Sequence, residues 1–195
     1  NPDRAHELSY VLHTRPTGRL FSRDDPLNKT TCINLMLPYV VTRYVCLIDN
    51  DVIVNGRNWL VQHIDSLTRW PDEIAAVGGF CGPQEWCNNR HVWRRMQEPV
   101  ARGYCTPCEV LNGAIVTTRT GILKQVPYED LPSCFLDDVV WSMRLRQAGF
   151  GVAFCQAAAV HHGDTNIYPN FDRAAMREHS LDEFHRVFGE ELGRL

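Results

Sequence analysis

Two aspartates one residue apart are the strongest candidates for chemistry in this chain. Asp49 and Asp51 flank Asn50 directly after residues 44–48 (YVCLI), a continuous apolar run typical of a buried parallel strand. Ligands of open α/β sheets bind at the carboxyl ends of strands, and carboxylate oxygens suit Mg²⁺ or Mn²⁺, which also hold phosphate oxygens. The pattern therefore predicts a site for a metal ion and a diphosphate. A solvated Asx turn that ends the strand is the plain alternative.

A second pair of carboxylates, Asp137 and Asp138, stands at the start of a helix predicted over residues 133–148. Ser133 is the expected N-cap and Gly149 the expected C-terminal stop. Adjacent helical side chains point about 100° apart, so one carboxylate can face solvent while the other faces a cleft and accepts a proton from a hydroxyl. The alternative is structural, because acidic residues in a first turn interact favourably with the helix dipole.

His161 and His162 follow a short apolar strand predicted at residues 157–160, and Gly163 and Asp164 come next. Neutral imidazole is a frequent metal ligand. Either histidine is therefore a candidate partner for the acidic metal site. A histidine pair at a strand end is also typical of a surface loop, so the metal hypothesis depends on the aspartates lying nearby.

Four cysteines fall within a predicted loop or insertion at residues 81–109: Cys81, Cys87, Cys105 and Cys108. Four thiolates can hold a structural Zn²⁺, although five residues separate the first pair instead of the usual two to four. The Cys-x-x-Cys pair is also compatible with redox chemistry. The chain has 8 cysteines in all, about 4% of its residues, below the level of a disulfide scaffold. Free buried thiols in a reducing compartment are the simplest interpretation.

The elements that position these residues alternate along the chain. Strands are predicted at residues 8–14, 44–48, 74–80, 110–118, 152–154 and 157–160. Helices are predicted at residues 28–41, ending near Pro38, and at 59–67, 133–148 and 172–195. In the second helix, apolar residues at 60, 61, 64 and 67 are expected on one buried face. The alternation predicts an α/β sheet flanked by helices, in one domain over residues 1–195.

Composition excludes several classes of protein. The chain has 195 residues with 20 basic and 23 acidic side chains, a net charge of -3, which makes a nucleic-acid partner unexpected. No apolar run approaches the roughly 18 residues of a transmembrane helix, and the first residues do not resemble a signal peptide. These features favour a cytoplasmic protein, with removal of a targeting segment as the alternative. The amphipathic segment at residues 172–195 is expected to pack on the domain, with a partner or a membrane surface as the alternatives.

The order of these segments resembles the inverting family-two glycosyltransferases of the GT-A fold. An asparagine-containing helix at residues 28–41 leads into the strand YVCLIDND, which carries a D-x-D motif. The later motifs of the family follow in the same order, over about residues 28–164: Trp59 in its helix, Gly78-Gly79 at a strand end, Asn112-Gly113-Ala114 with Arg119, Asp137-Asp138 with Arg144-Leu145 and Gly149, and His161-His162. One departure is Val140, which stands where the family has a further acidic residue.

The resemblance implies a GT-A-like (Rossmann-like) mixed sheet, mainly parallel, and an enzyme of hexosyltransferase type. It assigns donor binding to Asp49, Asn50, Asp51, Asn112, Gly113 and Ala114. It assigns the metal, Mn²⁺ or Mg²⁺, to Asp51 most directly, then to Asp49, His161 and His162. Asp138, with Asp137 beside it, aligns with the base that deprotonates the acceptor hydroxyl. Only 48 residues precede Asp49, so part of the family's N-terminal nucleotide-binding half is expected to be absent from this sequence.

The sequence therefore predicts a metal-dependent inverting glycosyltransferase that uses a nucleoside-diphosphate sugar and an acceptor of unknown identity. Two other hypotheses stay open. One is a zinc-stabilised binding module without catalysis, based on the four clustered cysteines. The other is a metal-dependent phosphohydrolase that uses Asp49, Asp51, His161 and His162.

Overall fold

The computed structural model describes six stretches of the chain and the isolated residue Asp182. The stretches are residues 28–49, 52–55, 58–70, 73–81, 105–130 and 136–162. The strand predicted at residues 8–14 lies outside them, and so does the helix predicted at residues 172–195, apart from Asp182.

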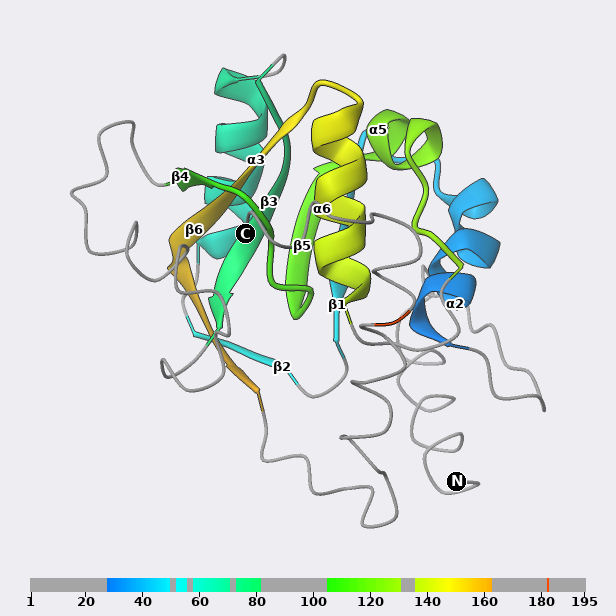
Figure 1. The fold of residues 1–195 in the computed structure, drawn as a ribbon. Helices are drawn as coiled ribbons and strands as arrows, with labels where there is room; N and C mark the ends of the chain where they lie inside the picture. The colour runs from blue at the N-terminus through cyan, green and yellow to red at the C-terminus, as the bar shows by residue number, and fades with distance from the viewer. Residues whose placement is uncertain are drawn as a thin grey trace, which may run out of the picture.

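Six strands form one mixed sheet in the described part of the chain (Figure 1). Their order is β1-β5-β3-β6-β2, and β4 pairs with β6 beside this path. The strands are β1 (Tyr44–Ile48), β2 (Val52–Asn55), β3 (Ile74–Cys81), β4 (Cys105–Cys108), β5 (Ile115–Arg119) and β6 (Gly151–His162). The helical elements are α2 (Lys29–Met36), η1 (Leu37–Tyr39), α3 (Trp59–Arg69), α5 (Thr120–Gln125) and α6 (Asp137–Gln147).

The mixed α/β sheet flanked by helices confirms the predicted fold class, but the parallel share is smaller than expected. Among the described strands, only β3 and β6 pair in parallel. The other four pairings are antiparallel, and two of them place β5 between β1 and β3. The prediction that residues 44–48 form a buried parallel strand is wrong on both counts. In the described sheet, β1 comes first in the order, pairs antiparallel with β5 and is only part-buried, with Ile48 49% exposed.

Two layers of side chains cover the two faces of the sheet. Alternate residues of β6 point to opposite faces: Val152 and Phe154 belong to one buried cluster, Ala153 and Cys155 to another. Leu67 of α3 packs in the second cluster. The helices α3 and α6 therefore lie on opposite sides of the sheet (Figure 1).

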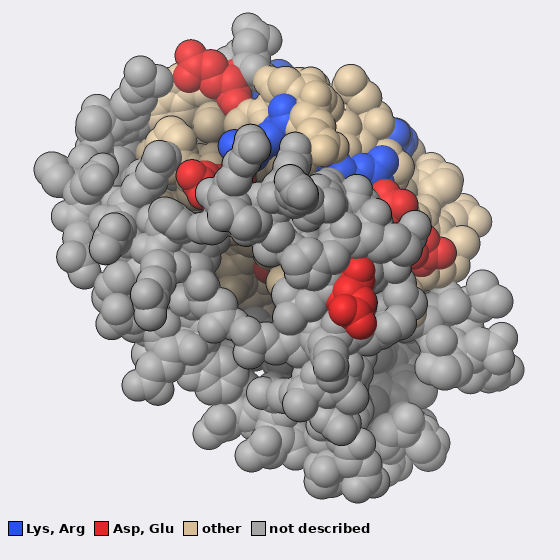
Figure 2. Space-filling model, viewed as in Figure 1, with Lys and Arg blue, Asp and Glu red and all other residues tan. Residues whose placement is uncertain are grey.

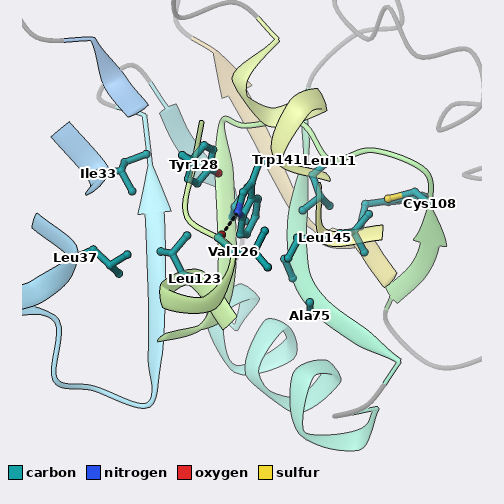
Figure 3. Packing of buried hydrophobic residues seen from close by; sticks show 14 residues of the cluster. Ile33, Leu37, Ala75, Cys108, Leu111, Leu123, Val126, Tyr128, Trp141 and Leu145 are labelled. Carbon is teal, nitrogen blue, oxygen red and sulfur yellow. Dashed lines mark hydrogen bonds between the residues drawn. The ribbon is translucent and has the colours of Figure 1, made fainter. Parts of the chain in front are cut away.

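The larger core cluster lies under α6 (Figure 3). Trp141 is fully buried there, stacks on Tyr128 with ring centroids 4.7 Å apart, and donates a hydrogen bond of 2.8 Å from Nε1 to the carbonyl of Val126. Leu145 lies one turn further along the same face of α6 and is also fully buried. The indole can be buried without leaving an unpaired polar group, because its N–H keeps a hydrogen-bond acceptor. These contacts fix the orientation of α6 on the sheet.

The start of α2 is stabilised by its own sequence. The side chain of Asn28 accepts a hydrogen bond of 2.8 Å from the backbone N–H of Thr31, which satisfies one of the free donors at a helix N-terminus. Pro38 lies in η1, where the α-helix has already ended. The predicted helix that ends near Pro38 is therefore confirmed.

Several predicted boundaries are wrong. Helix α6 begins at Asp137 instead of after Ser133, and Leu136 before it is in the left-handed region with φ 64°. The strand predicted from residue 110 begins at Ile115, because residues 113 and 114 form a turn. The strands predicted at 152–154 and 157–160 are one continuous strand, β6. Strand β4 lies inside the predicted irregular loop.

The buried face of α3 also differs from the prediction. Leu60 and Val61 are exposed, Val61 by 67%, whereas His63, Ser66 and Leu67 are buried. His63 Nδ1 lies 2.9 Å from the hydroxyl of Thr117 on β5. Polar residues can occupy a buried face when the sheet supplies hydrogen-bond partners, which periodicity of apolar residues alone does not reveal.

No helix among the described residues is long and apolar enough to span a membrane. On the face shown in Figure 2, acidic and basic side chains of the described residues are interspersed. This distribution agrees with the near balance of 20 basic and 23 acidic side chains in the chain.

Candidate active site

Four segments that are distant in sequence meet at one end of β1. They are the first residue of α2, the end of β1, the turn before β5 and the start of α6. The antiparallel ladder of β1 and β5 pairs Ile48 with Ile115 and continues with a hydrogen bond of 2.9 Å from the N–H of Asp49 to the carbonyl of Ala114. The ladder therefore places the predicted D-x-D segment beside the predicted Asn112-Gly113-Ala114 turn.

Lys29 joins these segments. Its Nζ lies 2.9 Å from Oδ1 of Asp49 and 3.4 Å from Oδ2 of Asp137, and it donates a hydrogen bond of 3.2 Å to the carbonyl of Gly113. Burial opposes the charge of the Lys29 ammonium, but the carboxylates around it, Asp137 foremost, outweigh burial and raise the pKa of Lys29 above its usual value. Lys29 is therefore a fully charged cation held among acidic groups.

Asp137 is the most buried carboxylate of the site, with 5% of its surface exposed. Its Oδ2 makes no hydrogen bond of good geometry, so the contact with Lys29 is an ion pair only. Burial raises the pKa of Asp137 to about 6, with a further contribution from Asp138, while Lys29 partly offsets the rise. A carboxyl group that titrates near neutral pH is a feature of functional sites.

Asp138 has a different environment. Its Oδ2 accepts a hydrogen bond of 2.8 Å from the N–H of Gly113, and its Oδ1 accepts one of 2.8 Å from the N–H of Val139. Burial raises the pKa of Asp138, although Lys29 and the two backbone donors oppose the rise. Each oxygen keeps a further lone pair, so Asp138 anchors the turn and still retains the capacity to accept a proton.

The turn between β4 and β5 leaves little room for a side chain at Gly113. A Cβ atom on Gly113 would lie 3.1 Å from Cβ of Asp138 and 3.1 Å from Nζ of Lys29. The side chain of Asn112 accepts a hydrogen bond of 2.9 Å from the N–H of Ala114 and closes the turn. The sequence Asn-Gly-Ala therefore places a peptide group without a side chain between the ammonium of Lys29 and the carboxylate of Asp138.

The structure brings together most of the predicted site residues that it describes. Asp49, Asp137, Asp138 and the turn at residues 112–114 are neighbours through Lys29. Asn50, Asp51, Gly163 and Asp164 lie outside the described residues.

The two histidines are placed by their backbones alone. His162 pairs with Val52 and His161 with Ile53 in the ladder of β6 and β2, which directly follows residues 50 and 51. The ladder therefore brings the end of β6 next to the chain that leaves the D-x-D segment. The metal-ligand set of Asp49, Asp51, His161 and His162 stays a prediction, because the positions of the histidine side chains are not described.

The cysteines of the predicted zinc site do not gather in the described part of the chain. Cys105 packs in the cluster on one face of the sheet, 2.8 Å from the hydroxyl of Ser66, whereas Cys108 packs in the cluster on the other face. Three residues apart on a strand, the two thiols point in opposite directions. This arrangement favours neither a shared zinc ion nor a Cys-x-x-Cys disulfide.

The other half of the predicted zinc set is not described: the side chain of Cys81 and the whole of Cys87 lie outside the described residues. Among described residues, no group of three or more candidate ligands surrounds a possible metal position. The structural zinc therefore stays an untested prediction.

Lys29 is the residue of this cluster that sequence reasoning missed. It stands in a helix that the sequence predicts, but a single lysine at a helix start resembles a solvated surface residue. The signal available in the sequence was its position, because the helix that leads into the D-x-D strand starts with this cation. Three acidic residues near one another require a counter-charge, and that requirement appears only once the fold brings them together.

The mixed sheet, its flanking helices and the carboxylates at the end of β1 define a transferase domain of the GT-A-like class. The chain belongs to the family described as glycosyltransferase like family 2, whose sequence model matches residues 28–178. This range contains every segment of the site. No curated protein matches the chain. Membership of the family confirms the resemblance inferred from the ordered motifs and identifies the chain as a glycosyltransferase.

Proposed function

We propose that this glycosyltransferase is metal-dependent and moves a sugar, with inversion, from a nucleoside-diphosphate sugar to an acceptor hydroxyl. The observation that carries the proposal is the convergence of Asp49 with the helix pair Asp137 and Asp138. Asp49 of the D-x-D segment and Asp137 of the helix pair both lie within ion-pair distance of Lys29, at 2.9 and 3.4 Å. This convergence supports a site in which donor binding and acceptor activation occur side by side.

The carboxylate of Asp49 has the chemistry that a divalent metal prefers. Asp49 is part-exposed and pairs with Lys29 through its Oδ1, and its Oδ2 is proposed to contact the cation. Asp49 and Asp51 would hold Mn²⁺ or Mg²⁺, with His161 or His162 completing the set. When bound, the metal supplies neutralisation of the charge that grows on the leaving diphosphate.

Asp138 is proposed as the general base. It takes the proton of the acceptor hydroxyl while the hydroxyl oxygen forms a bond to the anomeric carbon. The bond from that carbon to the diphosphate oxygen breaks on the opposite side, and its electron pair leaves with the diphosphate. One in-line displacement of this kind inverts the anomeric centre. The raised pKa of Asp138 supports proton acceptance nearer neutral pH than an ordinary aspartate allows.

Two substitutions separate the donor role from the base role. Asp51→Ala is expected to abolish Mn²⁺-dependent binding of UDP or GDP in calorimetric titration. Asp138→Asn is expected to retain that binding while transfer to an acceptor falls by about 100-fold or more. Asp65→Asn serves as the matched control, because Asp65 lies on α3, away from the site, and pairs with Arg69 at the surface.

The results that contradict the proposal are equally definite. Undiminished nucleotide and metal binding by Asp51→Ala removes that residue from the donor site. Full transfer by Asp138→Asn removes it as the base. Release of phosphate from an ester in water, with no dependence on an acceptor, indicates the phosphohydrolase hypothesis instead.

A further inference from the structure

We propose that Lys29 is a positioning residue, which holds the turn at residues 112–114 and the start of α6 in register with the end of β1. The inference rests on the proposed function, because it states how the base and the donor-side carboxylate are kept in place. Lys29 acts on Gly113, Asp49 and Asp137 and does not itself contact the substrate.

The ammonium group of Lys29 faces three oxygen atoms of the protein. An ammonium group has three N–H donors and no acceptor. Nζ of Lys29 lies within 3.4 Å of three oxygens, one each on Asp49, Asp137 and Gly113. Protein oxygens therefore surround the ammonium of Lys29, although Oδ2 of Asp137 is held by charge and not by a hydrogen bond of good geometry.

The three acceptors come from separate parts of the chain. Residue 49 directly follows β1, residue 113 lies in the turn before β5 and residue 137 begins α6, and the ribbon shows β1, β5 and α6 as separate elements (Figure 1). The ladder of β1 and β5 fixes the first two relative to each other. The ion pair between Lys29 and Asp137 adds α6 to that frame.

Gly113 lies between Lys29 and the proposed base, Asp138. Gly113 is held on both sides, since its carbonyl accepts from Lys29 and its N–H donates to Asp138. The peptide of Gly113 thus connects Lys29 to the Asp138 carboxylate. The packing here is tight, since a Cβ atom on Gly113 would lie 3.1 Å from Nζ of Lys29 and 3.1 Å from Cβ of Asp138. A displacement of Lys29 is therefore expected to move the peptide of Gly113 and, with it, the carboxylate of Asp138.

Lys29 is also the counter-charge of the carboxylates around it. Asp49, Asp137 and Asp138 influence one another across the site, and Lys29 is the cation that opposes their repulsion. With a neutral side chain at position 29, three like charges are left close together in a buried site. They relieve the repulsion by moving apart or by taking up protons, and either response disturbs the base.

The test compares Lys29→Met with Lys124→Met. Lys124 is an exposed lysine that also donates to a backbone carbonyl, that of Val40, at 3.0 Å, so it controls for the loss of a lysine contact. With Lys29→Met, kcat is expected to fall by about 10- to 100-fold, while the affinity for the nucleoside diphosphate with Mn²⁺ changes by less than about threefold. Lys124→Met is expected to leave both quantities unchanged. A large loss of nucleotide affinity with unchanged kcat makes Lys29 a substrate-binding residue and overturns the proposal.

Hydrogen exchange provides a readout that does not depend on the proposed activity. The amide of Gly113 is expected to exchange about tenfold faster in Lys29→Met than in the parent protein, whereas amides in the centre of β3 and β6 stay unchanged. If the parent protein transfers no sugar but this local acceleration is observed, the proposed function fails and the positioning role stands. Unchanged exchange at Gly113 overturns the positioning role, whatever the activity.

A double variant keeps the proposal testable if Lys29→Met does not fold. Lys29→Met combined with Asp137→Asn removes both charges of the buried ion pair and leaves no unpaired carboxylate at position 137. The contact of Lys29 with Gly113 is also lost in the double variant, so the amide of Gly113 is expected to exchange about tenfold faster there than in Asp137→Asn alone. Equal exchange of this amide in Asp137→Asn and in the double variant overturns the argument.

Discussion

Replacement of Asp137 by asparagine is expected to stabilise the protein at neutral pH. Asp137 is buried and its pKa is raised to about 6, first by burial and then by Asp138. Keeping this carboxylate ionised in the folded state is therefore unfavourable. Asparagine has nearly the same shape and removes the charge, so the unfavourable free energy disappears with it.

The magnitude follows from the two pKa values. The ordinary value is 3.8 and the folded value is about 6, a difference of about 2 pH units at roughly 1.4 kcal/mol per unit. Between these two values the folded state binds more protons than the unfolded state, so the stability contributed by this group falls as pH rises through the window. Asp137→Asn is thus expected to gain about 3 kcal/mol at pH 7.5, about 1 kcal/mol at pH 4.5 and nearly nothing below pH 3.8.

Urea unfolding of the parent protein and of Asp137→Asn at several pH values measures this difference directly. Asp65→Asn, an exposed aspartate in an i,i+4 pair with Arg69, is the control and is expected to show little pH-dependent gain. A stability gain of the same size at pH 4.5 and pH 7.5 refutes the reasoning, because only the ionised carboxylate is unfavourable. A loss of stability at pH 7.5 shows that the ion pair with Lys29 outweighs burial.

Three further outcomes are expected. Gly113→Ala lowers the free energy of unfolding by about 1–3 kcal/mol and reduces sugar transfer. Gly121→Ala is the control, because a Cβ there meets nothing within 4 Å, and it is expected to leave stability and transfer unchanged. Equal effects of the two substitutions in thermal unfolding and activity assays would exclude a special role for Gly113. Trp141→Phe leaves the carbonyl of Val126 without its buried donor and lowers the free energy of unfolding in urea by about 2–3 kcal/mol; a loss near zero would mean that water replaces the indole. Treatment with EDTA abolishes nucleotide binding in calorimetry and added Mn²⁺ restores it, unless the donor site needs no metal.

The sequence predicts well those elements whose signals are local. The strand β1 (Tyr44–Ile48) matches its prediction in both bounds because a short apolar run ends abruptly in polar residues. The end of α2 before Pro38 is predicted by the missing N–H of proline. The helical stop at Gly149 is confirmed by its positive φ of 87°.

The errors arise where partners distant in sequence decide the outcome. His63 is buried because Thr117 on β5 supplies a hydrogen bond, and nothing near His63 in sequence signals that partner. The direction of β5 between β1 and β3 is likewise set by tertiary packing. The role proposed for Lys29 follows from three acceptors at positions 49, 113 and 137, which only the folded chain brings together.

The antiparallel ladder between β1 and β5 fixes more than the sheet. A slip of that ladder by two residues would keep every side chain on its original face, but it would move Asp49 by about 7 Å along the strand, well beyond the 2.9 Å at which it meets Lys29. The alternation of inward and outward side chains therefore does not by itself protect the site, and the close packing of the buried strand β5 has to hold the register. Packing at β5 thus serves the site as well as stability, so variants of β5 selected for stability also need a turnover assay.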